Sequence, residues 1–281
     1  MENYGEAKAR LFTRPDLKTA IVNVGDRFGA GLADRELTAQ QIIRVAVAGD
    51  SGNDVDAELV AELLSADANG LRIRFSGAYG TTEFTSPMWG RFNVENLAIA
   101  AGILIAHGFG IDQIVAALAR IEAPAGRMQV LRGGADRPTV VIDFAHTPDA
   151  LEQVLRALRD HCTGSVACVF GCGGDRDRGK RSAMGAIAAA NADRVVVTDD
   201  NPRHEDPDTI VEAILAGSDA TDSVDVIRDR ATAIAAAIEQ ASVGDAVLIA
   251  GKGSETHQLI GNQRNEFSDA AVARAALGGD A

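Results

Sequence analysis

The second half of the sequence alternates short apolar runs with longer amphipathic stretches, and this alternation limits the possible folds more than any other feature. Candidate strands occupy residues 139–144, 165–170, 194–198, 224–227 and 245–250, and candidate helices occupy 149–161, 181–191, 208–217, 229–241 and 269–277. Strands separated by helices of this length form right-handed βαβ crossovers. The pattern therefore predicts an α/β domain with a Rossmann-like, doubly wound, mostly parallel sheet.

The first part of the chain is less regular and predicts a separate domain. Strands are expected at residues 17–24, 44–48, 71–75 and 81–85, and helices at 93–107 and 111–121. The stretch 93–107 is apolar almost all round, which predicts a fully buried helix. Pro124-Ala125-Gly126 breaks the pattern, so we place a domain boundary there and expect domains at 1–123 and 124–281. A chain of 281 residues, 46% of them hydrophobic, can form two cores.

Charge and cysteine content exclude several classes of partner. The formal net charge of -13 argues against a nucleic-acid backbone or an anionic membrane surface as the main partner. No apolar run approaches the roughly 20 residues of a membrane span, and no signal peptide is recognisable. The three cysteines lack metal-ligand spacing with histidine and are expected to be free thiols. We therefore expect a cytoplasmic protein without membrane insertion.

The segment TDDNPRHEDP at residues 198–207 is the most informative loop. It follows an apolar run and precedes a helical stretch, and loops at the carboxyl ends of parallel strands are where α/β sheets bind ligands. Arg203 can form a bidentate fork with a carboxylate, and Asp199 or Asp200 can accept hydrogen bonds from an ammonium. The loop suits an amino acid, although a solvated turn that caps the next helix is the alternative.

Two further loops, 171–181 and 251–255, also follow predicted strands and should lie at the same edge of the sheet. Residues 174–180 match G-x-x-x-x-G-K, but Arg181 stands where a phosphate-binding P-loop needs Ser or Thr for Mg²⁺. We therefore interpret this loop as a cationic segment at a helix N-terminus, suited to carboxylate or phosphate. A charged loop whose glycines serve only for turning is the alternative.

Three polar residues outside these loops have open interpretations. His146 follows a strand, where its ring could touch a phosphate or bond the backbone. Asn93 and Asn96 lie on the apolar helix, where buried amides need partners. The edge of an adenine ring or a neighbouring carbonyl could be the hydrogen-bond partner of such an amide.

Together these stretches resemble the Mur ligases of peptidoglycan synthesis, and among them the diaminopimelate-adding members. The matching segments are MENYGEAKARLF at the start, GRFNVEN at 90–96, PAGRMQ at 124–129, DFAHTPDAL at 143–151, FGCGGDRDRGKR at 170–181, DDNPR at 199–203, GKGSE at 251–255 and GNQR at 261–264. The resemblance implies an ATP-dependent ligase with ATP and Mg²⁺ as cofactors. Such an enzyme phosphorylates the free carboxylate of the UDP-MurNAc-dipeptide (UDP-N-acetylmuramoyl-L-alanyl-D-glutamate) and joins it as an amide to meso-diaminopimelate.

The resemblance also implies roles for individual residues. The diaminopimelate pocket would comprise Arg176, Asp200, Asn201, Pro202, Arg203, Gly251 and Glu255, and the nucleotide contacts would be Asn96, Arg127, Asp143 and His146. Lys8 would be catalytic as a carbamate, whose anionic oxygens suit Mg²⁺. Lysine lacks the second carboxylate of diaminopimelate, so a pocket containing two arginines should reject it.

The sequence departs from the family in two respects. Ser254 stands where the family usually has histidine in the G-K-G-x-E loop. The family's N-terminal domain and its G-T-N-G-K-[ST] P-loop do not occur in these residues and would precede Met1, so 1–123 is expected to be a partial central, ATP-binding domain. We therefore expect a truncated chain, inactive alone, whose partner is a missing N-terminal half. The alternatives are a non-catalytic amino-acid-binding fragment or pseudo-ligase, or another Mur or folylpolyglutamate-type ligase.

Overall fold

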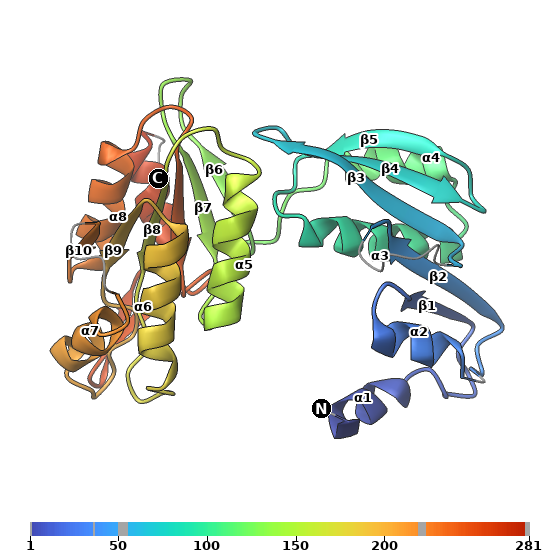
Figure 1. Cartoon of the computed structure of the whole chain (residues 1–281), viewed down its shortest axis with the longest axis horizontal. Helices are drawn as coiled ribbons and strands as arrows, with labels where there is room; N and C mark the ends of the chain where they lie inside the picture. The colour runs from blue at the N-terminus through green and yellow to red at the C-terminus, as the bar shows by residue number, and fades with distance from the viewer. Residues whose placement is uncertain (1, 36, 50–55, 219–222, 279–281) are drawn as a thin grey trace. The chain divides into compact units, whose positions relative to one another are not determined.

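Two β-sheets, one in each half of the chain, organise the computed structural model (Figure 1). The structure describes residues 2–35, 37–49, 56–218 and 223–278. It divides into two units, Met1–Ile121 and Glu122–Ala281, each with its own packed interior. The division lies two residues before the boundary expected from Pro124-Ala125-Gly126.

The first unit has a five-stranded sheet in which the strands follow the order of the chain. Its elements are α1 (Glu2–Ala9), β1 (Thr19–Asn23), α2 (Arg27–Ala33), β2 (Gln41–Val47), β3 (Leu59–Asp67), β4 (Gly70–Gly77), β5 (Thr82–Ser86), α3 (Phe92–Ala106) and α4 (Ile111–Leu118). β1, β2 and β3 are parallel, whereas β3, β4 and β5 are antiparallel. The sheet is therefore mixed, and its register shifts once, between Leu63 and Ser65 of β3.

Burial in this sheet follows the period-2 alternation of its side chains. On β4, Ile73 and Phe75 are fully buried, while Arg72 and Arg74 lie on the other face and pair with Glu83 of β5. One face of these antiparallel strands is therefore core, and the other carries charges.

The helix α3 is buried on one side only, which corrects the expectation of a fully buried helix. Val94, Leu97 and Ala101 are buried, and α3 packs on strands β1 to β4. Ile103, however, is 45% exposed. The sheet contacts one face of the helix and α4 also packs against it, while Ile103 lines an open hollow on this unit. Apolar composition alone therefore overestimated its burial.

The second unit has a six-stranded sheet in the order β10-β9-β8-β11-β7-β6. Its elements are β6 (Gln129–Arg132), β7 (Thr139–Asp143), α5 (Pro148–Arg159), β8 (Val166–Phe170), α6 (Lys180–Asn191), β9 (Arg194–Val197), α7 (Pro207–Leu215), β10 (Val224–Val226), α8 (Arg230–Gln240), β11 (Ala246–Ala250) and α9 (Asp269–Ala276). A small antiparallel hairpin is formed by β12 (His257–Ile260) and β13 (Gln263–Glu266). All strands of the large sheet are parallel except the edge strand β6.

Helices cover both faces of this sheet. α5, α6 and α7 contact one another in succession, while α8 and α9 contact each other and form a shared core with the sheet (Figure 1). Every residue of the central strands β8 and β11 is buried, as expected for parallel strands between two helical layers. The predicted doubly wound α/β fold is confirmed.

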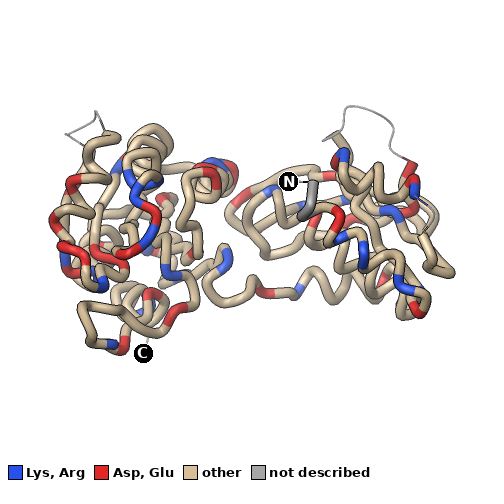
Figure 2. Tube along the Cα trace, turned by 90° about the horizontal axis from the view of Figure 1, so that it is seen from below, with Lys and Arg blue, Asp and Glu red and all other residues tan. Residues whose placement is uncertain are grey.

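Acidic and basic residues are spread over both units (Figure 2). None of the helices in the described parts of the chain is long and apolar enough to cross a membrane.

Candidate functional site

The loops that follow β7, β8, β9 and β11 meet at one edge of the large sheet because these strands are parallel. They enclose a cavity of about 350 Å³, to which the separate loops contribute Arg176, Lys180, Asp200, Arg203 and Glu255. Two larger hollows, of about 550 and 660 Å³, lie on the first unit and beside the β12–β13 hairpin. Neither of those hollows lies at the edge where the strand-end loops converge, so the smaller cavity is the candidate site.

Glycines allow the β8 loop and the β9 loop to pack with their backbones in contact. A Cβ atom on Gly171 would lie 2.1 Å from the carbonyl oxygen of Thr198, and one on Gly174 would lie 1.9 Å from that of Pro202. The Gly174 N–H donates to the carbonyl of Asn201 at 2.9 Å. Any side chain at these glycines would push the loops apart, so the glycines determine how closely the two loops approach.

Arg203 and Arg176 form the cationic side of the cavity. Arg203 has a left-handed backbone (φ 53°), and its N–H and C=O bond Leu259 and Gly261 of the hairpin at 3.0 and 2.7 Å. Its Nη1 donates to the carbonyl of Gly174 at 2.8 Å. Arg176 is exposed and has no hydrogen-bond or ion-pair partner within the described chain. Both guanidinium groups therefore retain donors for a ligand.

Asp200 forms part of the acidic side. Its side chain is buried, and within the described chain no donor bonds its carboxylate. Burial raises the pKa of this carboxyl group, although the charges of Arg230 and Lys252 oppose the rise. A Cβ atom on Gly251 would lie 2.8 Å from Asp200 Oδ2, so the absence of a side chain at Gly251 makes room for the carboxylate.

Glu255 completes the acidic side within a tight polar cluster. Asn201 Nδ2 donates to Glu255 Oε2 at 3.0 Å, and Lys252 Nζ donates to the same oxygen at 3.1 Å and to Asn201 Oδ1 at 3.0 Å. Burial acts to raise the pKa of Glu255, but the hydrogen bonds from Asn201 and Lys252, together with the charges of Lys252 and His257, outweigh it and lower the pKa below its usual value. Glu255 is therefore a carboxylate at neutral pH.

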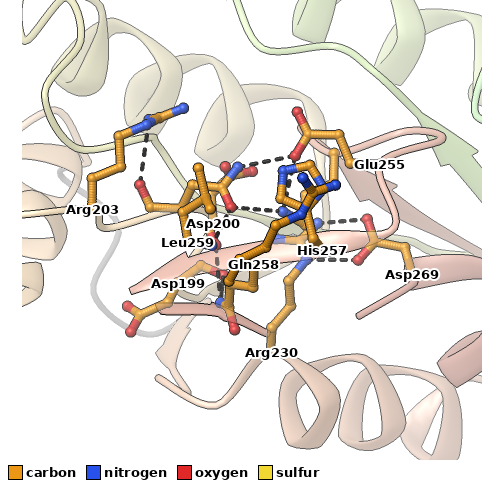
Figure 3. A network of polar contacts seen from close by, with 12 residues as sticks. Asp199, Asp200, Arg203, Arg230, Glu255, His257, Gln258, Leu259 and Asp269 are labelled. Carbon is orange, nitrogen blue, oxygen red and sulfur yellow. Dashed lines mark hydrogen bonds and ion pairs between the residues drawn. The ribbon is translucent and has the colours of Figure 1, made fainter. Parts of the chain in front are cut away.

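A second layer of ion pairs supports these loops from behind. Arg230 forms a two-pronged pair with Asp269 at 2.7 and 2.8 Å, and both side chains are fully buried (Figure 3). Arg228 donates two hydrogen bonds to the Asp199 carboxylate, from Nε at 2.8 Å and from Nη2 at 3.1 Å. Asp199 is not part of the cavity lining, although its neighbour Asp200 is.

Pro202, expected in the pocket, is buried but does not line the cavity. The carbonyl of Pro202 packs against Gly174, where the loops after β8 and β9 touch. Pro202 therefore contacts the protein and not the cavity. Asn201 does line the cavity, but its side-chain oxygen is already occupied, since it accepts from both Lys252 and Leu259 N.

Three of the four residues expected at the nucleotide, Arg127, Asp143 and His146, form a second group beside the cavity. The two oxygens of Asp143 accept from Met128 N at 2.8 Å and Ala145 N at 2.7 Å, and burial raises the pKa of this carboxyl group. The Arg127 guanidinium lies 4.8 Å from the centre of the Phe144 ring. His146 lines the cavity and bonds the carbonyl of Phe144 through Nδ1 at 2.9 Å. Arg127 and Asp143 do not line it.

Lys8 and Asn96 belong to the first unit. Asn96 is exposed, which corrects the expectation of a buried amide, and its Nδ2 donates to Asn93 Oδ1 at 3.0 Å. Asn93 is buried and donates to the carbonyl of Trp89 at 2.6 Å, so a neighbouring carbonyl satisfies it. Lys8 is exposed near the end of α1. Within the described ranges, no group of three or more His, Cys, Asp or Glu is placed to hold a metal ion.

Sequence reasoning missed several residues of the site. Lys180 lines the cavity and donates to the carbonyl of His146 at 2.6 Å, which joins the β8 loop to the β7 loop. Its position at the start of the helix after a Gly-rich loop was the available signal. Cys172 also lines the cavity, and burial raises the pKa of its thiol to about 11. Lys252 lies behind the lining, where only the fold could place it.

Comparisons with known protein families match both units. The Mur ligase middle domain matches residues 1–104, and the Mur ligase glutamate ligase domain matches residues 126–253. A UDP-N-acetylmuramoyl-L-alanyl-D-glutamate-2,6-diaminopimelate ligase from Xylella fastidiosa is 48% identical over 277 residues, which are 99% of this chain and 55% of the relative. A ligase of the same name from Parasynechococcus marenigrum is 46% identical over 99% of this chain and 56% of its own. The chain thus spans about half the length of the curated relatives that it matches.

Solved structures agree with these matches. A diaminopimelate ligase of the same name superposes with a TM-score of 0.73 at 37% identity, covering 99% of this chain and 56% of the other. A folylpolyglutamate synthase from Thermotoga maritima superposes with a TM-score of 0.67 at 20% identity, over 89% of this chain and 54% of its own, and supports the fold alone. On the family matches to both units and the identity to curated relatives over almost the entire sequence, the chain belongs to the Mur ligase family.

Proposed function

We propose that the cavity binds meso-diaminopimelate and that the chain contributes this site to an ATP-dependent ligase acting on the UDP-MurNAc-dipeptide. The observation that carries the proposal is the meeting of Arg176, Arg203, Asp200 and Glu255, from separate loops, in one cavity of about 350 Å³. The names of the relatives, which are 46–48% identical, point to the same substrate. The proposal includes a cytoplasmic location, where the nucleotide substrates are found.

The charges of the cavity match an amino acid with two zwitterionic ends. Arg176 and Arg203 would each receive one of its two carboxylates, and Asp200 and Glu255 would each accept hydrogen bonds from an ammonium group. Lysine has no second carboxylate and would leave guanidinium donors unpaired. Sites built around a polar group reject analogues that lack it by a factor on the order of 10⁴.

In the proposed reaction, ATP transfers its terminal phosphoryl group to the glutamyl carboxylate of the dipeptide. The amine of diaminopimelate then attacks the acyl carbon, phosphate leaves, and an amide forms. The cavity would bind the amino acid with its reacting amine held in place, which is how orientation accelerates such steps. Asp143 would act indirectly, because both of its oxygens bond the backbone of the segments that carry Arg127 and His146.

Asn96 and Lys8, both in the first unit, are the residues proposed to contact the nucleotide and Mg²⁺. The side-chain oxygen of Asn96 accepts no hydrogen bond within the described chain and is available to an adenine amino group. Lys8, as a carbamate, would offer Mg²⁺ one anionic oxygen ligand, and Mg²⁺ commonly takes one or two carboxylates and completes its shell with phosphate oxygens and water.

We expect these 281 residues to bind the amino acid without turning over ATP. No G-T-N-G-K-[ST] segment occurs in them, and phosphoryl transfer depends on a cradle for the phosphates. Addition of ATP and the UDP-MurNAc-dipeptide to the chain should therefore release no phosphate. Release of phosphate that depends on diaminopimelate would contradict this expectation.

Titration calorimetry tests the binding proposal directly. meso-Diaminopimelate should release or absorb heat with the wild-type protein, and L-lysine at the same concentrations should not. Arg203→Ala should abolish binding, because it removes a guanidinium from the cavity. Arg156→Ala is the matched control, since Arg156 is a 70% exposed side chain on α5 whose partner is Glu152. Absence of binding to the wild type, or equal binding of lysine, would refute the proposed substrate.

A further inference from the structure

Lys252 is a buried ammonium group just behind the candidate site. It follows β11, its side chain is completely inaccessible, and it does not line the cavity. Buried lysines are rare because removing the charge from water is unfavourable unless partners compensate. The partners here are Asn201 Oδ1 at 3.0 Å and Glu255 Oε2 at 3.1 Å. Both partner residues line the cavity.

The hydrogen bonds of Lys252 determine how Asn201 is oriented. Asn201 Oδ1 accepts from Lys252 Nζ and also from Leu259 N at 2.9 Å. With its oxygen held by two donors, the amide must present its nitrogen to Glu255, and Nδ2 donates to Oε2 at 3.0 Å. Reversal of the amide would place its N–H groups against two donors. The ammonium group and Leu259 N together therefore fix the polarity of the amide.

The same arrangement leaves the two oxygens of Glu255 unequal. Oε2 accepts from both Asn201 and Lys252, whereas Oε1 accepts no hydrogen bond within the described chain. A carboxylate oxygen has lone pairs for further donors. Because Glu255 lines the cavity, Oε1 is the oxygen left for a ligand.

We propose that Lys252 is a positioning residue that selects for an amino group on the ligand: it holds the Asn201 amide and Glu255 Oε2, so that Glu255 Oε1 receives one ammonium of the amino acid. This inference rests on the proposed function, since it takes the ligand to be diaminopimelate. Lys252 itself does not contact the ligand.

The charges around Glu255 support this role. Lys252 comes from the same loop, His257 from β12, Asp200 from the β9 loop, and Arg230 with its partner Asp269 from α8 and α9 (Figure 3). Burial alone would raise the pKa of Glu255, and the hydrogen bonds from Asn201 and Lys252, with the charges of Lys252 and His257, reverse that effect. Removing Lys252 should raise the pKa, so that Glu255 becomes protonated at a higher pH and loses its attraction for an ammonium.

The test compares ligands that differ by one amino group. meso-Diaminopimelate and the two enantiomers of 2-aminopimelate, each of which lacks one of its amino groups, are titrated into wild-type protein and Lys252→Met. The wild type should bind diaminopimelate more tightly than the enantiomer that lacks the amino group at Glu255. In Lys252→Met this preference should shrink about tenfold, as expected for a lost charge-assisted hydrogen bond. Lys18→Met, at an exposed lysine of the first unit, should leave the preference unchanged.

The dependence of diaminopimelate affinity on pH provides a second test, because it would not change if Lys252 had a purely structural role. Wild-type affinity for diaminopimelate should persist to lower pH than the affinity of Lys252→Met, because only the variant has a Glu255 that is easily protonated. Glu255→Gln should lower the preference in the same way and serves as the second variant if Lys252→Met does not fold. The double variant Lys252→Met/Glu255→Gln should melt at a higher temperature than Lys252→Met, because it lacks the uncompensated carboxylate.

The outcomes separate this inference from the proposed function. Wild-type protein that does not bind diaminopimelate would overturn both. Wild-type binding together with an unchanged ligand preference and pH profile in Lys252→Met would overturn the role of Lys252 and leave the proposed function intact.

Discussion

The buried pair between Arg230 and Asp269 makes a quantitative prediction about the stability of the second unit. Arg230 begins α8 and Asp269 begins α9, and the pair joins these helices to the end of β11 through a hydrogen bond from Arg230 Nη2 to the Ala250 carbonyl at 3.0 Å. Both side chains are 0% exposed. Arg230 Nη1 is buried and has no hydrogen-bond partner among the residues that the structure describes. The pair thus contains strong bonds and one unsatisfied donor group.

Replacing one partner should be far more destabilising than replacing both. Arg230→Met leaves the Asp269 carboxylate buried without its counter-charge, and breaking such a pair lowers the free energy of unfolding by about 3–5 kcal/mol. The double variant Arg230→Met/Asp269→Leu removes both charges, and apolar replacement of a buried pair is often neutral or stabilising. It also removes the unsatisfied Nη1, whose burial costs about 1–3 kcal/mol. The double variant should therefore recover most of the lost stability.

Urea unfolding with two probes can locate the effect. The single tryptophan, Trp89, lies in the first unit, so its fluorescence follows that unit while circular dichroism follows both. Arg230→Met should shift the circular dichroism transition of the second unit and leave the fluorescence transition in place. The control Arg194→Met removes a partly exposed pair with Asp225 and should cost about 0.2–1 kcal/mol. A loss below about 1 kcal/mol in Arg230→Met, or a double variant no more stable than it, would refute the argument.

Two further predictions concern pH and the cavity. The two-pronged bond from Arg181 lowers the pKa of Glu205 from 4.5 to about 2, so its stabilisation is complete above pH 4.5 and is lost as the pH falls toward 2. Glu205→Gln should flatten the acid unfolding curve, followed by circular dichroism, in this window, and an unchanged curve would contradict the assignment. Asp200→Asn removes a buried carboxylate to which no described residue donates a hydrogen bond, so at neutral pH it should raise the melting temperature by a few °C, about 1 kcal/mol corresponding to roughly 2–4 °C. The same variant should lose diaminopimelate binding in calorimetry, and a lower melting temperature would count against the argument.

The sequence predicted the parts of the fold in which local pattern and tertiary environment agree. The central strands β8 and β11 lie between helical layers and are buried throughout, so their apolar runs were visible. The edge strand β6, with the sequence QVLR, was missed. β3, with the sequence LVAELLSAD, has no clear alternation and was missed, because its strand conformation depends on pairing with β2 and β4. β13 was missed because its residues, QRNE, are all exposed and carry no hydrophobic signal.

The candidate site was predictable to the level of loops but not of atoms. Parallel strands place their carboxyl ends together, so the meeting of the loops followed from the order of strands and helices. That order did not show which groups of these loops face a ligand and which bond other parts of the protein. Asp199 and Asp200 are neighbours of the same type, yet Asp199 pairs with Arg228 whereas Asp200 lines the cavity. That difference depends on the placement of a residue far along the chain.

The contacts of the segment Asp199–Arg203 explain why so few of its groups remain for a ligand. Asp199 bonds Arg228, the Asn201 oxygen bonds Lys252 and Leu259, and the Arg203 backbone is tied to the hairpin. Among its side-chain groups, the Asp200 carboxylate, the free donors of Arg203 and the remaining N–H of Asn201 have no partner within the described chain. Bonds within the protein hold these groups in position before a ligand arrives, which lowers the entropy lost on binding. The segment therefore bonds first to the surrounding protein, and its recognition of a ligand depends on those bonds.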